Sequence, residues 1–163
     1  MASPYSVSPV LFESVSGVTA TMGTNDAEVG TVATVGDEVY VKVYNAGNSQ
    51  ISLGRGAVCS AVTGYSVTVS STSNDVFVGV CKHATLTTGT YGWLVKKGFV
   101  SIQLPTDVSC AAGAKLIAGV DGAFQGATPS TSTSAHLWEG NVYAKAMDAI
   151  ATGVSGSAYV SIY

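Results

Sequence analysis

Most of the chain consists of short stretches in which apolar and polar residues alternate, a pattern that predicts half-buried β-strands. The first two such stretches are EVGTVATV at residues 28–35 and EVYVKVYN at residues 38–45. In the second stretch Val39, Val41 and Val43 fall on one face, because successive side chains of a strand point to opposite sides. The Gly-Asp pair between the two stretches predicts a turn.

The same pattern continues to the end of the chain. Further strands are predicted at AVCSAV, YSVTVS, VFVGVC, YGWLVKKG and FVSIQL, each bounded by Gly, Ser, Asn or Pro. A short strand is predicted at Lys115–Ala118, followed by a hairpin turn at Asp121-Gly122. ATPSTSTSA reads as a polar loop. Val142–Ile150 is compatible with a short helix, but the surrounding β pattern favours a strand that pairs with Ala158–Tyr163.

About ten short strands with glycine turns, and no alternation of strands and helices, predict a single all-β domain of the sandwich or barrel type. We place this domain at residues 21–163. Residues 1–20 differ, since Pro4 and Pro9 favour extended backbone there. We interpret them as an extended N-terminal arm. Its candidate contact residues for a partner are Pro4, Tyr5, Val7, Pro9, Leu11 and Phe12.

Composition adds a weak argument for assembly. Only 10% of the residues are charged, against about 25% in ordinary soluble domains, and a chain packed into a larger particle tolerates this deficit. The net charge of −3 argues against a nucleic-acid partner. No targeting segment and no apolar run of membrane-spanning length is visible, so we expect synthesis in a cytosol. Three cysteines, an odd number, suggest free thiols.

The strongest candidate for chemistry is the run Cys81-Lys82-His83 in the predicted strand from Val76. On a strand Cys81 and His83 would share a face at a backbone separation of roughly 6.5–7 Å, too far for an easy nucleophile–base contact. No orienting third group is evident. We therefore interpret Cys81 as a small buried apolar residue and His83 as an edge residue. A zinc site from these two with Cys59 and Cys110 lacks the paired spacing of structural zinc sites.

Other motifs are equally uninformative about catalysis. The acidic residues form no calcium loop, no Gly-x-Ser-x-Gly elbow occurs, and the Gly-Arg-Gly at residues 54–56 is not followed by a helix that would make it a phosphate loop. His136 and Trp138 could form an exposed aromatic pair that contacts a sugar or, in preference, a neighbouring subunit. We expect no enzymatic activity, no cofactor and no metal.

The order of glycines and strands from about residue 50 resembles that of small capsid decoration (cement) proteins of tailed bacteriophages and prophages. The features that carry the resemblance are Gly54-Arg55-Gly56, Val78-Gly79-Val80, the glycines at 89, 92 and 98, Gly113 before Lys115-Leu116, and the closing NVYAKAMDAIATGVSGSAYVSIY. The resemblance implies a compact β-barrel-like or β-tulip domain. It also implies a homotrimer on the outer surface of a phage head that clamps subunits of the major capsid protein.

Two alternatives from other classes remain open at this point. The first is a β-sandwich module of a virion tail or fibre that binds a receptor or glycan, for which exposed Trp93 and Trp138 would be suitable. The second is a hydrolase whose acidic residues converge only in the folded protein.

Overall fold

The computed structural model describes residues 28–59, 65–70, 76–127 and 142–163. The predicted arm and most of the predicted polar loop lie outside these ranges. The described residues form an all-β structure, which confirms the predicted fold class. The elements are β1 (Val32–Val35), β2 (Glu38–Asn45), β3 (Gly56–Cys59), β4 (Ser66–Val69), β5 (Phe77–Val80), β6 (Tyr91–Gln103), β7 (Lys115–Ala118), the 3-10 turn η1 (Val120–Gly122), β8 (Phe124–Gly126), β9 (Ala144–Ala146) and β10 (Ser155–Ser161).

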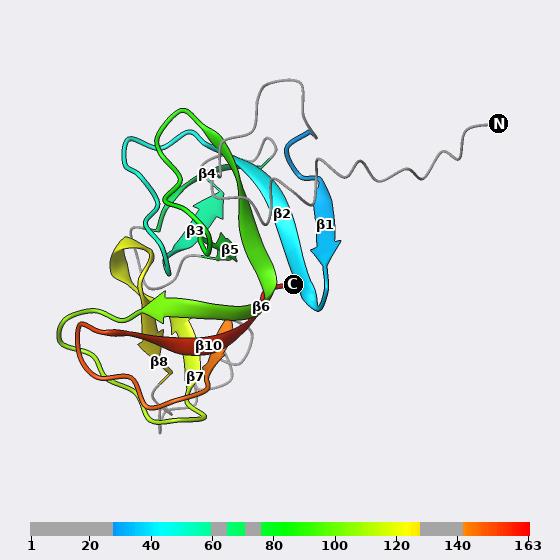
Figure 1. Cartoon of the computed structure of the whole chain (residues 1–163). Coiled ribbons are helices and arrows are strands. Elements are labelled where there is room, and N and C mark those ends of the chain that lie inside the picture. The colour runs from blue at the N-terminus through cyan, green and yellow to red at the C-terminus, as the bar shows by residue number, and fades with distance from the viewer. Residues whose placement is uncertain (1–27, 60–64, 71–75, 128–141) are drawn as a thin grey trace, which may run out of the picture.

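Five of these strands close into a barrel. The order β2-β4-β3-β5-β6 returns to its start through a pairing of β2 with β6, and β1 extends the sheet beside β2 (Figure 1). The β2–β4 pair is parallel and the others are antiparallel. The barrel interior is filled by small and branched apolar side chains with at most 1% exposure: Val41, Val43, Ile51, Ala57, Val67, Cys81, Leu86 and Leu94.

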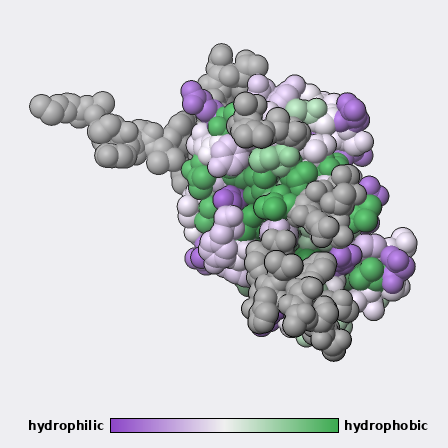
Figure 2. All heavy atoms as spheres, turned by 180° about the vertical axis from the view of Figure 1, so that it is seen from behind, coloured by the Kyte–Doolittle hydropathy of each residue, from purple (hydrophilic) through white to green (hydrophobic). Residues whose placement is uncertain are grey.

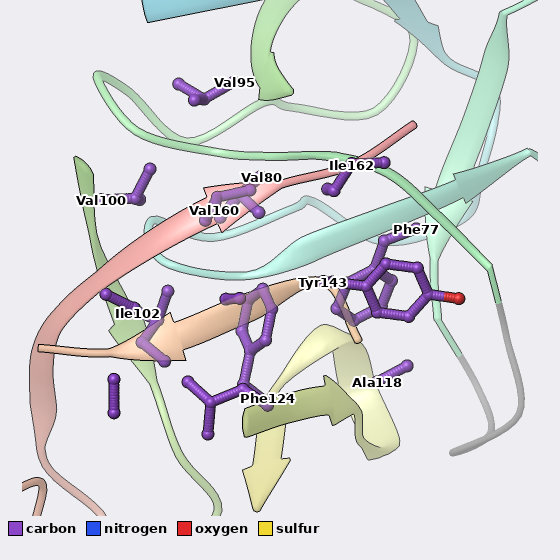
Figure 3. Close-up of a cluster of buried hydrophobic side chains, with 14 of the residues drawn as sticks. Phe77, Val80, Val95, Val100, Ile102, Ala118, Phe124, Tyr143, Val160 and Ile162 are labelled. Carbon is purple, nitrogen blue, oxygen red and sulfur yellow. The ribbon is translucent and has the colours of Figure 1, made fainter. Parts of the chain in front are cut away.

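A second layer is built on the same long strand. The first half of β6, Tyr91–Lys97, pairs with β2, and its second half, Lys97–Gln103, pairs with β10. The sheet then continues through β9 and β7 to β8, in the lower part of Figure 1. This extension packs against the outside of the barrel. Its core centres on Phe77, whose ring lies 5.1 Å from that of Phe124 and 5.2 Å from that of Tyr143 (Figure 3).

The structure corrects three boundaries. The predicted strands YGWLVKKG and FVSIQL form one strand, because β6 bends at Gly98 (φ 139°) without ending there. The strand predicted for Val142–Ile150 is limited to β9, although it does pair with β10 as expected. The strand containing Phe77 ends at Val80, one residue before Cys81. The hairpin at Asp121-Gly122 is confirmed between β7 and β8.

Gly54 shows how closely the segment before β3 approaches the second half of β6. Its N–H donates to the carbonyl of Cys81 (2.8 Å), and its carbonyl accepts from the N–H of Gln103 (3.1 Å). The residue has a φ of +75°, and a Cβ atom there would lie 2.6 Å from the backbone oxygen of Ser101. A side chain is therefore excluded both by backbone conformation and by space.

We expect Gly54→Ala to lower the free energy of unfolding by about 2–4 kcal/mol, since left-handed strain and overpacking add. Gly89→Ala is the matched control, because Gly89 has nearly the same φ (+74°) but no neighbouring atom within 4 Å of the place that a Cβ atom would take. That variant should lose only about 1–2 kcal/mol, from strain alone. Urea denaturation measures both, and equal losses would contradict the role assigned to the close contact.

Candidate functional site

The Cys81-Lys82-His83 run does not form a catalytic pair. Cys81 is 1% exposed and belongs to the barrel interior, where its Sγ donates to the carbonyl oxygen of Ala84. Burial raises the pKa of its thiol to about 11, so the thiol stays protonated and unreactive at neutral pH. His83 instead lies at the surface. The interpretation of Cys81 as a buried apolar residue is confirmed.

Lys82 and His83 meet two side chains of β2 instead. The Nζ of Lys82 forms an ion pair with Oε1 of Glu38, and the hydroxyl of Tyr40 donates to Oε2 of the same carboxylate. The Nε2 of His83 lies 2.9 Å from the Tyr40 oxygen, and the two rings stack with centroids 5.7 Å apart. We call these four residues the Glu38 cluster. It joins the start of β2 to the segment that follows β5.

The electrostatics of the Glu38 cluster fix the protonation states. Burial raises the pKa of Glu38, but the hydrogen bonds from Lys82 and Tyr40 and the nearby positive charge outweigh it, and the net pKa is lowered. Burial and the Glu38 carboxylate raise the pKa of Tyr40 far above its usual value. Burial and the Lys82 charge lower the pKa of His83. At neutral pH a neutral imidazole therefore donates to a tyrosine that donates to a carboxylate.

This arrangement provides stability and offers little chemistry. The Glu38 carboxylate is already occupied by two donors, and the Tyr40 proton is committed to it. Neither group is poised to accept a proton from a substrate at neutral pH. Sequence reasoning singled out Lys82 and His83 but missed Glu38 and Tyr40. Their i, i+2 spacing on one strand face was visible, whereas their partners were determined by closure of the barrel.

The other candidate ligands are dispersed. Cys59 is exposed at the end of β3, and Cys110 is part of a bridge to Ile150. Within the described ranges, no three His, Cys, Asp or Glu side chains come together as a metal-binding group. Across the same residues, no helix is long and apolar enough to cross a membrane.

A polar groove of about 680 Å³ lies between the β2–β3 connection, β4, the end of β6 and the β7–β8 turn. Arg55 crosses this groove: its Nε donates to Oε1 of Gln103 (3.1 Å), and its Nη1 donates to the carbonyl oxygen of Asp121 (2.5 Å). Amide and hydroxyl side chains make up most of the wall, and none of the described lining residues is aromatic. Both hydrogen bonds of Arg55 tie separate elements together, so its role in the structure is to join them.

Among the aromatic residues considered for ligand contact, only Trp93 lies within the described residues. Trp93 is only 5% exposed and packs in the core, so it does not provide the exposed aromatic face that would favour the glycan-binding alternative. His136 and Trp138 lie outside the described residues. The arm residues Pro4, Tyr5, Val7, Pro9, Leu11 and Phe12 also lie outside them.

Comparison with known proteins gives a likeness in fold. No protein-family model matches the sequence, and no curated protein matches it significantly. Among solved structures, the chain is similar to the N base of the head fiber protein gp8.5 of bacteriophage phi29. The TM-score is 0.50 at 15% sequence identity, and the match covers 75% of this chain and 94% of that chain. At this identity the match shows a shared all-β architecture.

From the burial of Cys81 we predict that its thiol is unreactive in the folded protein. In the folded protein a thiol reagent at pH 8 should modify the exposed Cys59 quickly and Cys81 only after unfolding, because the Cys81 thiol is both inaccessible and protonated. Cys81→Ala should lower the free energy of unfolding by about 1–2 kcal/mol through lost packing. Cys59→Ala, the control, should change it by no more than about 0.5 kcal/mol. Rapid labelling of Cys81 in the native state would contradict its assignment to the core.

The pKa shifts in the Glu38 cluster predict how the stability of the protein depends on pH. Because the folded-state pKa of Glu38 is lowered, its contribution to stability is present above the unfolded pKa and lost as the pH falls through the folded pKa. The lowered pKa of His83 acts in the same direction below its ordinary value. Glu38→Gln should therefore cost about 1–3 kcal/mol at pH 7 and show a shallower loss of stability between about pH 5 and 3.

Asp37→Asn is the control for this experiment, since Asp37 is an exposed neighbouring carboxylate outside the Glu38 cluster. Its melting temperature measured across the pH range should follow that of the wild type. If Glu38→Gln also follows the wild type from pH 7 to 3, the cluster does not control acid stability.

Proposed function

We propose that this chain is a structural protein of a bacteriophage head and has no enzymatic activity. The observation that carries the proposal is the fold shared with the base of a phage head fiber. The sequence resemblance to capsid decoration proteins supports the same assignment independently. The fully engaged groups of the Glu38 cluster and the protonated thiol of Cys81 are consistent with a scaffold.

More specifically, we propose a decoration or cement role. The protein would be made in the host cytoplasm, bind the outer capsid surface and stabilise the shell of the major capsid protein as a homotrimer. Low charge supports such packing, since the centres of interfaces are depleted in charged residues. The described surface carries large apolar side chains, and Figure 2 shows hydrophobic residues gathered on the middle of one face, with hydrophilic residues mostly around them.

The arm supplies a mode of attachment. Pro4 and Pro9 restrict the unbound backbone, which lowers the entropy lost on docking, and the alternating apolar residues suit addition of the arm as a strand to a capsid edge. Burial of Tyr5, Leu11 and Phe12 would each contribute about 1.5–3 kcal/mol before the cost of ordering the arm.

The glycan-binding alternative has less support. Saccharide sites commonly use an aromatic face, but Trp93 is buried and the described walls of the polar groove hold no aromatic residue. We therefore retain the capsid role as the single proposed function.

Deletion of residues 2–12 tests the proposal. The truncated protein should keep its melting temperature within a few degrees, yet its occupancy of expanded capsids should fall by orders of magnitude, because most of the docking energy is lost with the arm. Co-sedimentation with capsids measures the occupancy, and a variant with residues 2–12 in scrambled order controls for length and composition. Equal decoration by the truncated and full-length chains would show that the arm is not the anchor.

A further inference from the structure

The turn between β7 and β8 holds the one Asp-Gly dipeptide of the sequence, Asp121-Gly122, and the sequence has no Asn-Gly. In such a dipeptide the backbone nitrogen of the glycine is free to attack the side-chain carboxyl carbon of the aspartate, because glycine has no side chain to hinder it. Asp121 is exposed and borders the polar groove beside Arg55. The turn is therefore a candidate site for isomerisation of the backbone.

Water is the only co-reactant that this isomerisation needs. The nitrogen of Gly122 forms a bond to Cγ of the protonated Asp121 carboxyl group, and one carboxyl oxygen leaves as water with the carboxyl proton and the proton of the nitrogen. A water molecule then opens the cyclic imide at one of its two carbonyl carbons. Opening at Cγ restores aspartate, whereas opening at the backbone carbonyl carbon gives isoaspartate. In isoaspartate the main chain runs through Cβ and Cγ, so the turn becomes longer.

The backbone conformation of Asp121 opposes this ring closure. Its φ is 55° and its ψ is 32°, and among the described residues it is the one non-glycine residue with a positive φ. In an L residue with this ψ, the nitrogen of the next residue lies on the side of the Cα–C bond away from Cβ, so Cγ does not reach it. The ring closes only after rotation about this bond, which turns the carbonyl of Asp121 and moves Gly122.

Two contacts resist that rotation. Nη1 of Arg55 donates to the carbonyl oxygen of Asp121 at 2.5 Å, which holds the group that has to turn. Gly122 is buried, and a Cβ atom there would lie 2.5 Å from the carbonyl oxygen of Gly56, so the glycine has little room to move. Of the two, only the contact from Arg55 depends on a side chain and is open to substitution.

We propose that Asp121 is a site of slow isoaspartate formation and that Arg55 sets the rate by holding the β7–β8 turn closed. The reaction takes place within one chain, so this inference goes beyond the proposed function and does not depend on it. Isoaspartate at position 121 would displace Gly122 from its close contact with Gly56. It would thereby loosen the packing of the β7–β8 turn against β3. Arg55 takes no part in the bond changes and acts as a positioning residue.

Ageing of the full chain tests this proposal. The wild type is kept for several weeks at neutral pH and 37 °C, folded in buffer and unfolded in guanidinium chloride, and isoaspartate at position 121 is quantified by chromatography of the isomeric peptides. Folded Arg55→Ala, Arg55→Lys and Val43→Ala are aged in parallel. Val43 is buried in the barrel interior, so Val43→Ala is a control that loses packing without touching the turn. The melting temperature of each variant shows how far the losses of stability match.

We expect the folded wild type to form isoaspartate about tenfold more slowly than the unfolded chain, because the turn must open locally before the ring closes. Arg55→Ala should raise the folded rate about threefold or more. Arg55→Lys should fall between Arg55→Ala and the wild type, since one ammonium group replaces two separate donors. Val43→Ala should age like the wild type.

Equal rates in the folded and unfolded wild type would overturn the proposed protection of the turn, whatever the variants do. The role of Arg55 is overturned if Arg55→Ala ages like the wild type, or if Val43→Ala ages as fast as Arg55→Ala. If Arg55→Ala does not fold, Arg55→Lys decides the matter, and a wild-type rate in that variant counts against Arg55.

Discussion

The constraint on which the rest of the structure depends is that β6 takes part in two layers at once. In its first half Gly92–Val95 are buried in succession, because Leu94 fills the barrel while Trp93 and Val95 contribute to the core outside it. In its second half buried and exposed residues alternate, because only one face is covered there. A strand with these two patterns connects the barrel and the C-terminal sheet by backbone hydrogen bonds rather than by a linker.

The junction between the layers is reinforced by both apolar and polar contacts. The rings of Phe77, Phe124 and Tyr143 form its apolar centre. Arg55 links the barrel to Gln103 and to the β7–β8 turn at its edge. Gly122 fits so closely that a Cβ atom there would lie 2.5 Å from the carbonyl oxygen of Gly56. Relative movement of the two layers would break these contacts together.

The ionisable side chains of the Glu38 cluster and those on the outer face of the C-terminal sheet differ in how fully they are engaged within the fold. The ionisable groups of the Glu38 cluster are used to hold β2 against the segment after β5, so they are unavailable for catalysis. The outer face of the C-terminal sheet differs, because Phe99, Lys145 and Lys115 are exposed there.

The sequence by itself determined the all-β class, the β7–β8 hairpin and the burial of Cys81, because alternation, turn residues and apolar character are local properties. It could not determine that YGWLVKKG and FVSIQL form one strand, since a glycine bend and a glycine turn look the same in sequence. It left the exposure of Trp93 open, because only the fold shows that the second sheet covers this part of the barrel wall. It missed Glu38 and Tyr40, because closure of the barrel brings Lys82 and His83 to them. Closure of β2 on β6 and the pairing of β10 with β6 join residues more than 40 positions apart, and only the tertiary structure brings such residues into contact.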